Sequence, residues 1–542
     1  MPHSYERQNG IGNRHARVGV DITASASQTF NICYGMRIIM GLEGIVKAYR
    51  HLSATAEIRC RCRFRIRECA ARSCRSHAFP SSCRAFSHGN VQRAGNKSCD
   101  TTMLPDHPTM QNHVRHGAPG ADEMPHAPRV ALVNVKYSPN LGDGMLSECL
   151  EAELAAALPG IEIHVIDLAG RTDYACGAIS RKSVLTLMHH SPRVVRHAIV
   201  HSVLGYKLHT ELRPRWRSAL CGVDAVIVGG GNLLSDADLN FPMKLDAAMA
   251  EVRDLGLPAA VFGVGVSGDW TSRGELLFRR ALGGVALFHA SVRERRSAEI
   301  WRARLCGAGI RAAQVVHDPG HLVSRHVARH RAPDNAVTTI GLGITHPIAL
   351  KYHSGSIRVS AAAQAEWYRA LVRAGSAYGW RFVVFANGSP EDEAYIGELR
   401  PMLAEAAGLG RITFAPRAAT PADLARLISS FDLLMAHRLH ANIAAFSYAI
   451  PQIGFAWDVK LESFLSGVGR GHCLCTVGVD SIDAVVGLAV RQLGEGVDAH
   501  VHRTVLDDAC AHVADLAAAL RGAVARSRQP AGRARVPGES LV

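Results

Sequence analysis

The clearest pattern in this 542-residue chain is a series of short apolar runs that begins near residue 129 and repeats to beyond residue 450. The first run, Val130–Val135, is continuous rather than alternating, which is typical of a strand buried on both faces of a sheet. Apolar residues then recur at helical spacing over residues 145–158, and Pro159-Gly160 end the predicted helix. Because another apolar run, Ile161–Leu168, follows, the pattern predicts a strand–helix–strand unit in a parallel sheet.

The same alternation continues in two sets, which are separated by the Ala/Pro/Asp/Asn-rich residues 331–336. The further predicted strands are 223–228, 259–266, 287–292 and 314–316 in the first set, and 339–344, 382–385, 412–415, 433–435 and 452–456 in the second. We therefore predict an α/β, GT-B-like fold of two Rossmann-like domains, residues 128–330 and 337–520. In such folds the carboxyl ends of the strands face a central cleft, where ligands bind.

Both ends of the chain differ in composition from these two domains. Residues 1–125 contain 17 Lys and Arg against 9 Asp and Glu, with no sustained helical or strand period. We expect much of this segment to be disordered, or to be upstream sequence that is not part of the mature protein; a basic regulatory tail is the alternative. Residues 521–542, rich in Arg, Pro and Gly, are expected to form a disordered tail.

Composition and charge narrow the class of protein. Hydrophobic residues make up 48% of the chain and charged residues 20%, as is ordinary for a soluble globular protein. The net charge is +14, but residues 1–125 supply about +8 of it, so we expect no nucleic-acid partner. The apolar stretch 32–46 is shorter than the roughly 20 residues of a membrane-spanning helix. The cysteines fit no disulfide or zinc pattern, which favours a reducing, cytoplasmic location, with the inner face of the membrane as the second location considered.

The strongest candidate site lies where the strand 433–435 turns into a helix of small residues. Backbone N–H groups at a helix start attract anions, and Arg438 would add a planar, two-pronged donor for phosphate or carboxylate. His440 would add an imidazole, the side chain most often used in general acid–base chemistry. Lys460, after the next strand, adds another cation. The alternative is a helix-capping arginine and a core-facing histidine.

Two further motifs follow strands of the first domain. Gly229-Gly230-Gly231-Asn232 would let the backbone approach a ligand, or would simply make a tight turn. Asn140-Leu141-Gly142-Asp143 precedes the helix predicted at 145–158. Asp143 is expected to cap that helix or to reach a sugar hydroxyl from the cleft, and the two roles are compatible.

A cluster of arginines follows the strand 287–292. Arg293 is nearest to the end of the strand and is expected to point into the cleft. Arg295 and Arg296 are expected to be solvated charges of the following helix.

Metal and hydrolase signatures are weak or missing in the sequence. His437 and His440 could share a helical face, but no third ligand has matching spacing, and His472-Cys473-Leu474-Cys475 is similarly incomplete. We therefore expect no metal. The chain has neither a Gly-x-Ser-x-Gly elbow nor a phosphate-binding Gly-Lys-Ser/Thr loop, which excludes serine hydrolases of that type and P-loop enzymes.

Taken in order, these motifs resemble the polysaccharide pyruvyl transferase family over roughly residues 129–470. The motifs are Asn140-x-Gly142-Asp143, Gly229-Gly230-Gly231-Asn232-Leu233, Gly263-Val264-Gly265-Val266, Arg293 with Ser297, Asp318-Pro319, His437-Arg438-Leu439-His440-Ala441, Ile450-Pro451 and Asp458 with Lys460 and Phe464. Each motif alone is unspecific, and the specificity lies in their shared order at strand ends. Glu294, where the family often has aspartate, is a departure, and residues 1–125 match nothing in the family.

The resemblance implies a GT-B-like fold and transfer of pyruvate from phosphoenolpyruvate, as a ketal, onto a surface or extracellular polysaccharide. It implies a donor site that includes Arg438, Leu439 and His440, together with an upstream arginine that we match to Arg293 and a downstream lysine that we match to Lys460. We expect phosphoenolpyruvate to be a co-substrate, with no cofactor besides. His440 is our first choice for proton transfer, and Asp143 is a weaker choice for activating the acceptor.

The expected partners are phosphoenolpyruvate and a saccharide or lipid-linked oligosaccharide acceptor, with peripheral contact to the polysaccharide assembly machinery at the membrane. Two other functions stay open at this point. One is a nucleotide-sugar glycosyltransferase of the same fold, because fold does not fix chemistry. The other is a carbohydrate-binding or scaffold protein without catalytic activity. The sequence does not identify the acceptor sugar, the hydroxyls bridged or the oligomeric state.

Overall fold

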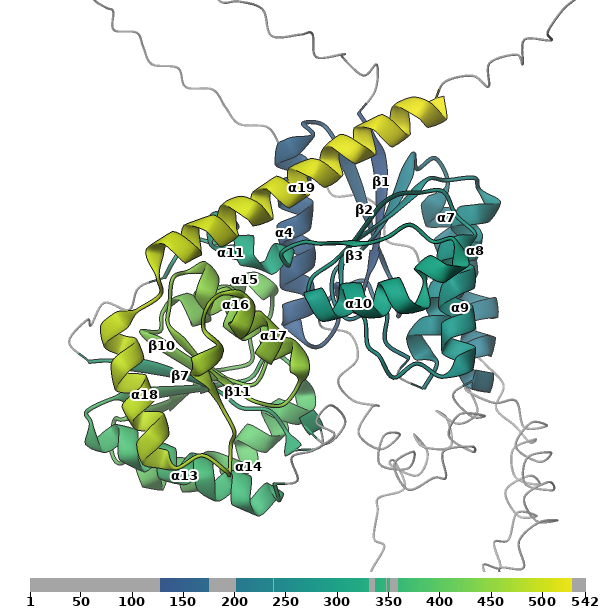
Figure 1. Ribbon diagram of the computed structural model, residues 1–542. Helices are drawn as coiled ribbons and strands as arrows, with labels where there is room; N and C mark the ends of the chain where they lie inside the picture. The colour runs from purple at the N-terminus through teal and green to yellow at the C-terminus, as the bar shows by residue number, and fades with distance from the viewer. Residues whose placement is uncertain are drawn as a thin grey trace, which may run out of the picture. The chain divides into compact units, whose positions relative to one another are not determined.

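The computed structural model describes residues 127–174, 201–236, 238–330, 337–347, 349–350 and 359–528. These residues form two α/β domains joined in one chain (Figure 1). The sequence-based predictions for residues 1–125, for the linker 331–336 and for residues 529–542 lie outside the described residues.

The first domain contains a six-stranded sheet in the order β2-β1-β3-β4-β5-β6, and every strand pair in it is parallel. Its strands are β1 (Arg129–Asn134), β2 (Glu162–Asp167), β3 (Ala225–Gly229), β4 (Ala259–Val264), β5 (Leu287–Val292) and β6 (Gln314–Val315). Its helices are α4 (Leu141–Ala157), α7 (Arg213–Leu220), α8 (Asn240–Asp254), α9 (Ser272–Gly283), α10 (Arg295–Arg304) and α11 (Val323–His326), with the π-helix Leu208–Leu212 and the 3₁₀ turns Cys306–Ala308 and Pro319–Leu322.

The second domain contains another six-stranded parallel sheet, in the order β12-β11-β10-β7-β8-β9. Its strands are β7 (Thr339–Gly343), β8 (Arg381–Phe385), β9 (Ile412–Phe414), β10 (Leu433–Ala436), β11 (Gln452–Phe455) and β12 (Leu474–Cys475). Its helices are α13 (Ala361–Ala377), α14 (Pro390–Ala407), α15 (Pro421–Ser429), α16 (Leu439–Ser447), α17 (Val459–Gly467), α18 (Ile482–Glu495) and α19 (Ala499–Arg528), with the 3₁₀ turn Gly471–Cys473. The predicted α/β class with two Rossmann-like domains is therefore confirmed.

The strand orders explain why the loops that carry the candidate motifs lie at the carboxyl ends of the strands. In each sheet the order reverses at a switch point, between β1 and β3 in the first and between β7 and β10 in the second. A crevice opens at the carboxyl ends of the strands at such a point. Residues 140–143 follow β1 and residues 230–232 follow β3, while residues 437–440 follow β10, so these motifs lie at the two crevices.

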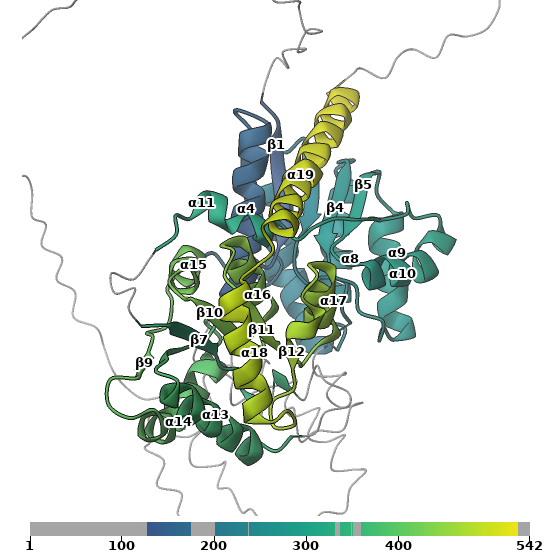
Figure 2. The ribbon, with the colours of Figure 1, turned by 60° about the vertical axis from the view of Figure 1, so that its left-hand side comes forward.

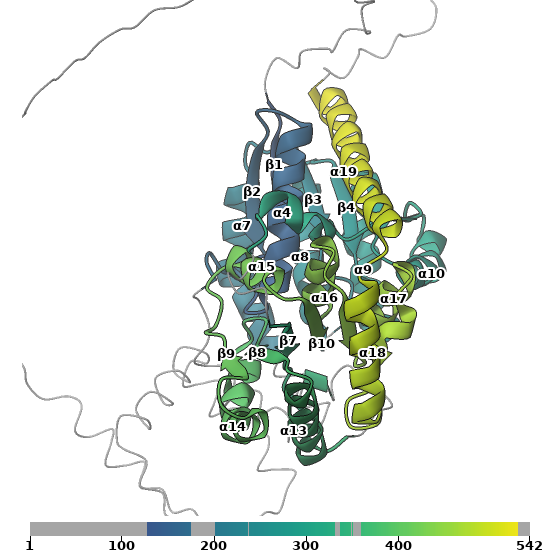
Figure 3. The same ribbon diagram turned by 90° about the vertical axis from the view of Figure 1, so that its left-hand side faces the viewer.

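Helices cover both faces of each sheet, and fully buried apolar residues fill the layers between. Apolar residues of α7, α8 and α9 pack on one face of the first sheet, and those of α4 and α19 pack on the other. Figure 3 shows α13 and α14 on one side of the second sheet and α15 and α16 on the opposite side. Because α4 also packs against α15 and α16, one helix belongs to the cores of both domains.

The last described helix, α19, corrects the predicted domain boundary and tail. It is continuous to Arg528, so residues 521–528, predicted to be disordered, are helical. Leu516, Leu520 and Val524 are buried against β1 and β3 of the first domain, and this burial stabilises the last turns. Figures 1 and 2 show α19 leaving the second domain beside α18 and running along α4.

Other predicted boundaries also differ. The helix predicted at 145–158 begins at Leu141, so Asn140 holds the N-cap position and Asp143 lies inside the first turn instead of capping it. The strand β12 was not predicted, because its two residues lie in the His/Cys segment that we examined as an incomplete metal site. Among the described residues, no helix is long and apolar enough to cross a membrane.

Candidate functional site

A buried aspartate, Asp318, brings the two domains' candidate residues together. Its Oδ2 lies 3.2 Å from Nη1 of Arg293, which follows β5, and 3.6 Å from Nε2 of His440, in the first turn of α16. Its Oδ1 accepts a hydrogen bond of 2.9 Å from the backbone N–H of Gly320. At 3.6 Å the contact with His440 is electrostatic rather than a hydrogen bond.

The charges in this cluster favour the ionised forms of Asp318 and Arg293, although both side chains are buried. Burial alone would raise the pKa of Asp318, but His440 foremost, and then Arg293 and the Gly320 N–H, hold that pKa well below its usual range. Burial would likewise lower the pKa of Arg293, but the charges of Glu294 and Asp318 raise it. The cluster therefore holds a carboxylate and a guanidinium out of bulk water.

Several buried polar atoms around this cluster have unfilled hydrogen-bonding capacity. Within the described part of the chain, the atoms without a hydrogen-bond partner include Asn140 Oδ1, Asn232 Oδ1, Arg293 Nε, His321 Nε2 and His440 Nε2. Buried polar atoms are normally paired, so a group of orphans in one place indicates where a polar ligand would bind.

Glycines make the close approach of these groups possible. A Cβ built on Gly265 would lie 2.8 Å from Asn232 Oδ1 and 3.2 Å from Arg293 Nε, so a side chain there would fill the space between them. Gly230 and Gly231 both have positive φ, of 77° and 71°. The predicted turn at the end of β3 is thus confirmed, and it brings Gly231 to within 3.6 Å of Asp143 Oδ1, measured from its built Cβ position.

The first turn of α4 lies directly against the start of α16. A Cβ built on Gly142 would lie 2.5 Å from both Cβ and Nδ1 of His440. The N–H of Leu141 donates a 2.8 Å hydrogen bond to the carbonyl of Asn387 in the second domain. The sequence motif 140–143 therefore fixes the position of His440 as well as placing Asp143 near Arg293, whose pKa it helps to raise.

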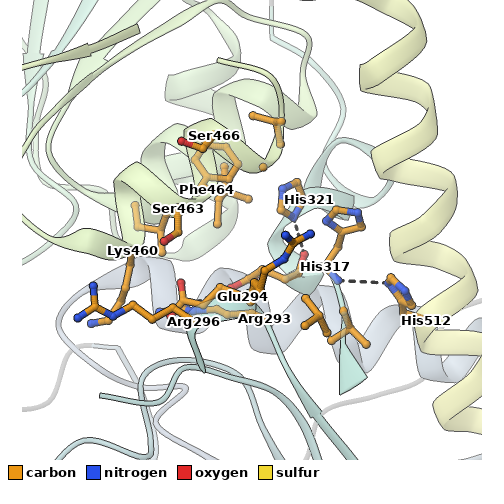
Figure 4. Close-up of a pocket in the computed structure, with 18 residues that line it drawn as sticks. Arg293, Glu294, Arg296, His317, His321, Lys460, Ser463, Phe464, Ser466 and His512 are labelled. Atoms are coloured by element: carbon orange, nitrogen blue, oxygen red, sulfur yellow. Dashed lines mark hydrogen bonds and ion pairs between the residues drawn. The ribbon is translucent and has the colours of Figure 1, made fainter. Parts of the chain in front are cut away.

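A pocket of about 570 Å³ opens beside this cluster, and Figure 4 shows its side chains. It is lined from the first domain by the loops after β5 and β6, from the second domain by α16 and α17, and by His512 of α19. The lining residues are Arg293, Glu294, Arg295, Arg296, Val315, Val316, His317, Asp318, His321, Leu439, Ile443, Lys460, Ser463, Phe464, Ser466, Gly467, Val468 and His512. Four permanent cations against two carboxylates make this lining cationic.

Some of the predicted cationic residues line this pocket, and one of them lies elsewhere. Arg293 and Lys460 line the pocket, and Lys460 Nζ forms a 3.0 Å ion pair with Asp458. Arg295 and Arg296 are exposed, as predicted, but they also line the pocket. Leu439 lines it too.

Arg438 lies outside the set of described residues that line the pocket. Its Nε and Nη2 donate to Oδ2 of Asp392, at 3.1 Å and 2.5 Å, and its guanidinium lies 5.4 Å from the ring centre of Trp457. Asp392 is fully buried and its Oδ1 accepts the backbone N–H of His346. The two-pronged donor predicted for a ligand is thus engaged with a carboxylate of α14 in this structure.

Sequence reasoning missed two acidic residues of this region. Asp318 belongs to one of the motifs named above but was given no role, although its position shortly after a strand and before a proline could have indicated the cleft. Asp392 gave no signal, because it is one of three acidic residues at a helix start and their charges look like ordinary stabilisation of the helix dipole. Among the described residues, no group of three or more His, Cys, Asp and Glu could hold a metal ion.

Fold and site define an α/β protein whose two domains share a cationic pocket. The family model for polysaccharide pyruvyl transferase matches residues 140–459, more than half of the chain. The chain belongs to the polysaccharide pyruvyl transferase family. A search of curated proteins finds no matching sequence.

Several solved structures resemble this chain over most of their length. The MnaA–UDP co-structure from S. aureus has 10% identity and a TM-score of 0.42, covering 72% of this chain and 94% of its own. The UDP-N-acetylglucosamine 2-epimerase of Rickettsia bellii has 11% identity and a TM-score of 0.43, covering 74% and 98%. A Thermobaculum terrenum O-GlcNAc transferase mutant has 14% identity and a TM-score of 0.37, covering 76% and 71%.

Proposed function

We propose that this protein transfers a pyruvyl group from phosphoenolpyruvate to a saccharide, as a ketal, in the biosynthesis of a surface or extracellular polysaccharide. The observation that carries the proposal is the cationic pocket beside Asp318 and His440 in a member of the pyruvyl transferase family. Phosphoenolpyruvate carries a phosphate and a carboxylate, so its site needs several cations at fixed separation. Arg293, Arg296 and Lys460 supply them.

The proposed reaction proceeds through an electrophilic carbon. The terminal enol carbon of phosphoenolpyruvate gains a proton, and the adjacent carbon is attacked by a sugar hydroxyl, which loses its proton to a base. Inorganic phosphate then leaves, and a second hydroxyl of the same acceptor bonds to that carbon and loses its proton, which closes the ketal. Atoms and electrons balance without an oxidant or reductant. We expect activity to survive exhaustive chelation, because the described residues contain no group of three or more His, Cys, Asp and Glu that could hold a metal ion.

Each role is assigned to a residue of the Asp318 cluster. Arg293, whose Nε is unpaired among the described groups, is proposed to hold an anionic oxygen of the donor. His440 is proposed to transfer the proton, because it combines burial with the adjacent carboxylate of Asp318. Asp143 is proposed to activate the acceptor from the first turn of α4. Asn140, Gly142, Gly230, Gly231 and Asn232 are proposed to shape the site.

Because Arg438 forms an ion pair with Asp392, we propose a structural role for Arg438. In this arrangement Arg438 holds the start of α16 to α14, and the donor is held by Arg293 and Lys460. Direct contact between Arg438 and the donor would use the guanidinium N–H groups that Asp392 does not take up. The proposed acceptor is a saccharide or lipid-linked oligosaccharide, encountered in the cytoplasm at the inner face of the membrane beside the assembly machinery.

A thermal-shift and turnover experiment tests the proposal. Phosphoenolpyruvate should raise the melting temperature of the full chain, whereas UDP-glucose and UDP-N-acetylglucosamine should not. Incubation with phosphoenolpyruvate and polymeric or lipid-linked acceptors should release phosphate and add the mass of a pyruvyl group, with or without EDTA. Protection by a nucleotide sugar alone would favour a glycosyltransferase instead. Binding of glycans without phosphate release from any acceptor would favour a carbohydrate-binding protein.

A further inference from the structure

The pocket has two chemically different ends. Figure 4 shows Lys460 and Arg296 at one end and His317, His321 and His512 at the other, with Arg293 between them. Phe464 of α17 adds an aromatic ring at the histidine end, where its ring centre lies 5.6 Å from that of His321. The first end suits an anion, whereas the second combines imidazoles with an apolar ring.

The volume of the pocket exceeds what the donor needs. A pocket of about 570 Å³ falls within the range of about 300–1,000 Å³ that holds a drug-sized molecule, whereas phosphoenolpyruvate is a three-carbon acid. The proposed reaction joins two acceptor oxygens to one donor carbon, so the acceptor must lie in contact with the donor. A single cavity therefore has to hold both molecules.

We infer that the histidine end, formed by His317, His321, Phe464 and His512, is the subsite for the acceptor sugar ring. This inference rests on the proposed function and adds the place where its second substrate binds. Sugars present hydroxyls around the edge of the ring and an apolar C–H face. A site for them therefore needs hydrogen-bonding side chains around an aromatic surface.

The hydrogen bonds of two histidines define what each can offer to a hydroxyl. Nδ1 of His321 lies 2.8 Å from the carbonyl oxygen of Asp318, so that nitrogen carries the proton and Nε2 is an acceptor. Nδ1 of His512 accepts the backbone N–H of His317 at 3.2 Å, so in the neutral ring Nε2 carries the proton and is a donor. The ring of His317 lies between the two, with its centre 5.4 Å from that of His321 and 5.6 Å from that of His512. The pocket therefore presents an acceptor and a donor at two places, which suits the several hydroxyls around one sugar ring.

His321 has a hydrogen-bond acceptor at this end that a ligand could fill. The residue is 3% exposed, and its Nε2 is without a partner in the described part of the chain. An unpaired buried acceptor costs free energy unless a ligand completes it.

The protonation states support a neutral ligand here. Burial, followed by the charges of His321 and His512, lowers the pKa of His317 to about 4. Burial also lowers the pKa values of His321 and His512. These rings are therefore uncharged at neutral pH, which suits a sugar hydroxyl rather than a second anion.

The test separates the two ends of the pocket by variants that lie on its surface. The acceptor-end variants are Phe464→Leu and His512→Ala, the donor-end variant is Lys460→Met, and His500→Ala, exposed on the same helix as His512, is the matched control. Phosphoenolpyruvate affinity is measured by calorimetry. The probes for the acceptor are the methyl glycosides of glucose, galactose, mannose and N-acetylglucosamine, with KM from phosphate release and binding from saturation-transfer NMR in the presence of phosphoenolpyruvate.

We expect Phe464→Leu and His512→Ala each to raise the acceptor KM about tenfold, the loss expected for one hydrogen bond or ring contact, with donor affinity within about twofold of wild type. Lys460→Met should show the reverse split, and His500→Ala should change neither. Unchanged acceptor KM in both acceptor-end variants would overturn the inference, as would a wild-type protein that binds phosphoenolpyruvate but none of the four glycosides. Failure of the wild type to bind phosphoenolpyruvate would count against the proposed function itself.

Discussion

Gly142 and His440, nearly 300 residues apart in sequence, are in such close contact that a Cβ on the glycine would lie 2.5 Å from Cβ and Nδ1 of the histidine. The glycine belongs to the first domain and the histidine to the second. Real Cβ atoms do not approach so closely, so any side chain at position 142 must displace the ring. The atom met first is the histidine's own Cβ, which a change of rotamer does not move.

Gly142→Ala should therefore cost both stability and turnover. Alanine is the better helix former by about 1 kcal/mol, but overpacking of about 1–3 kcal/mol opposes that gain. The double variant Gly142→Ala/His440→Gly removes the clash, because glycine at position 440 has neither the Cβ nor the ring that the new methyl group would meet. Urea unfolding of the two single variants and the double variant measures the coupling, and we expect the double variant to be more stable than the sum of the single effects. Simple additivity would show that the contact is not tight in solution.

His440→Gln should bind phosphoenolpyruvate with near wild-type affinity but lose roughly 10²–10⁴-fold in turnover. The amide keeps hydrogen-bonding capacity and approximate size, yet it cannot exchange a proton near pH 7. Calorimetry with phosphoenolpyruvate, beside single-turnover phosphate release, separates the two effects. Turnover near the wild-type rate would assign His440 to positioning alone.

Asp392→Asn should destabilise the protein by about 3–5 kcal/mol, because it leaves the guanidinium of Arg438 partly buried without its counter-charge. Arg438→Lys keeps the charge but loses the planar pair of donors to Asp392, so we expect a smaller loss of stability. Chemical denaturation of both variants provides the measurement. If Arg438→Lys instead leaves stability unchanged and weakens phosphoenolpyruvate binding about 30-fold or more, Arg438 contacts the donor directly, as the family resemblance implies.

Stability should fall as the pH is lowered from 7.5 to 5. Burial foremost, and then the charge of Arg438, lowers the pKa of His437 from 6.5 to about 3. Below pH 6.5, His437 is therefore protonated in the unfolded chain but stays neutral in the folded chain. The stability that is present above pH 6.5 is lost progressively toward pH 3.

At pH 5 the loss from His437 alone is about 2 kcal/mol. His437→Gln should flatten the pH dependence of the unfolding free energy by about that amount, whereas the exposed substitution His500→Gln should leave it unchanged. Equal slopes for wild type and His437→Gln would contradict the burial of this ring.

The sequence predicts the fold better than the site, because the fold follows from neighbouring residues whereas the site depends on residues far apart in the sequence. The strand β5 and the turn Gly230-Gly231 follow from neighbouring residues, because apolar runs and glycine conformations are local properties. The pairing of Arg438 with Asp392 joins residues 46 apart on different elements. The contribution of His512 depends on a helix that crosses to the other domain. The spacing of apolar residues along the sequence carries no information on such long-range partners, so only the folded structure shows them.

The position of α19 sets an order in which the molecule can be completed during synthesis. The sheet face around Val130 and Ile227 is covered by residues 509–524 of the same chain, more than 280 residues later. While the second domain is being translated, that apolar face is covered by α4 but not by α19, and the pocket has no His512. At about 5–20 residues per second, the exposed interval lasts on the order of 10 seconds to a minute. The core of the first domain is thus completed only after the second domain has been synthesised.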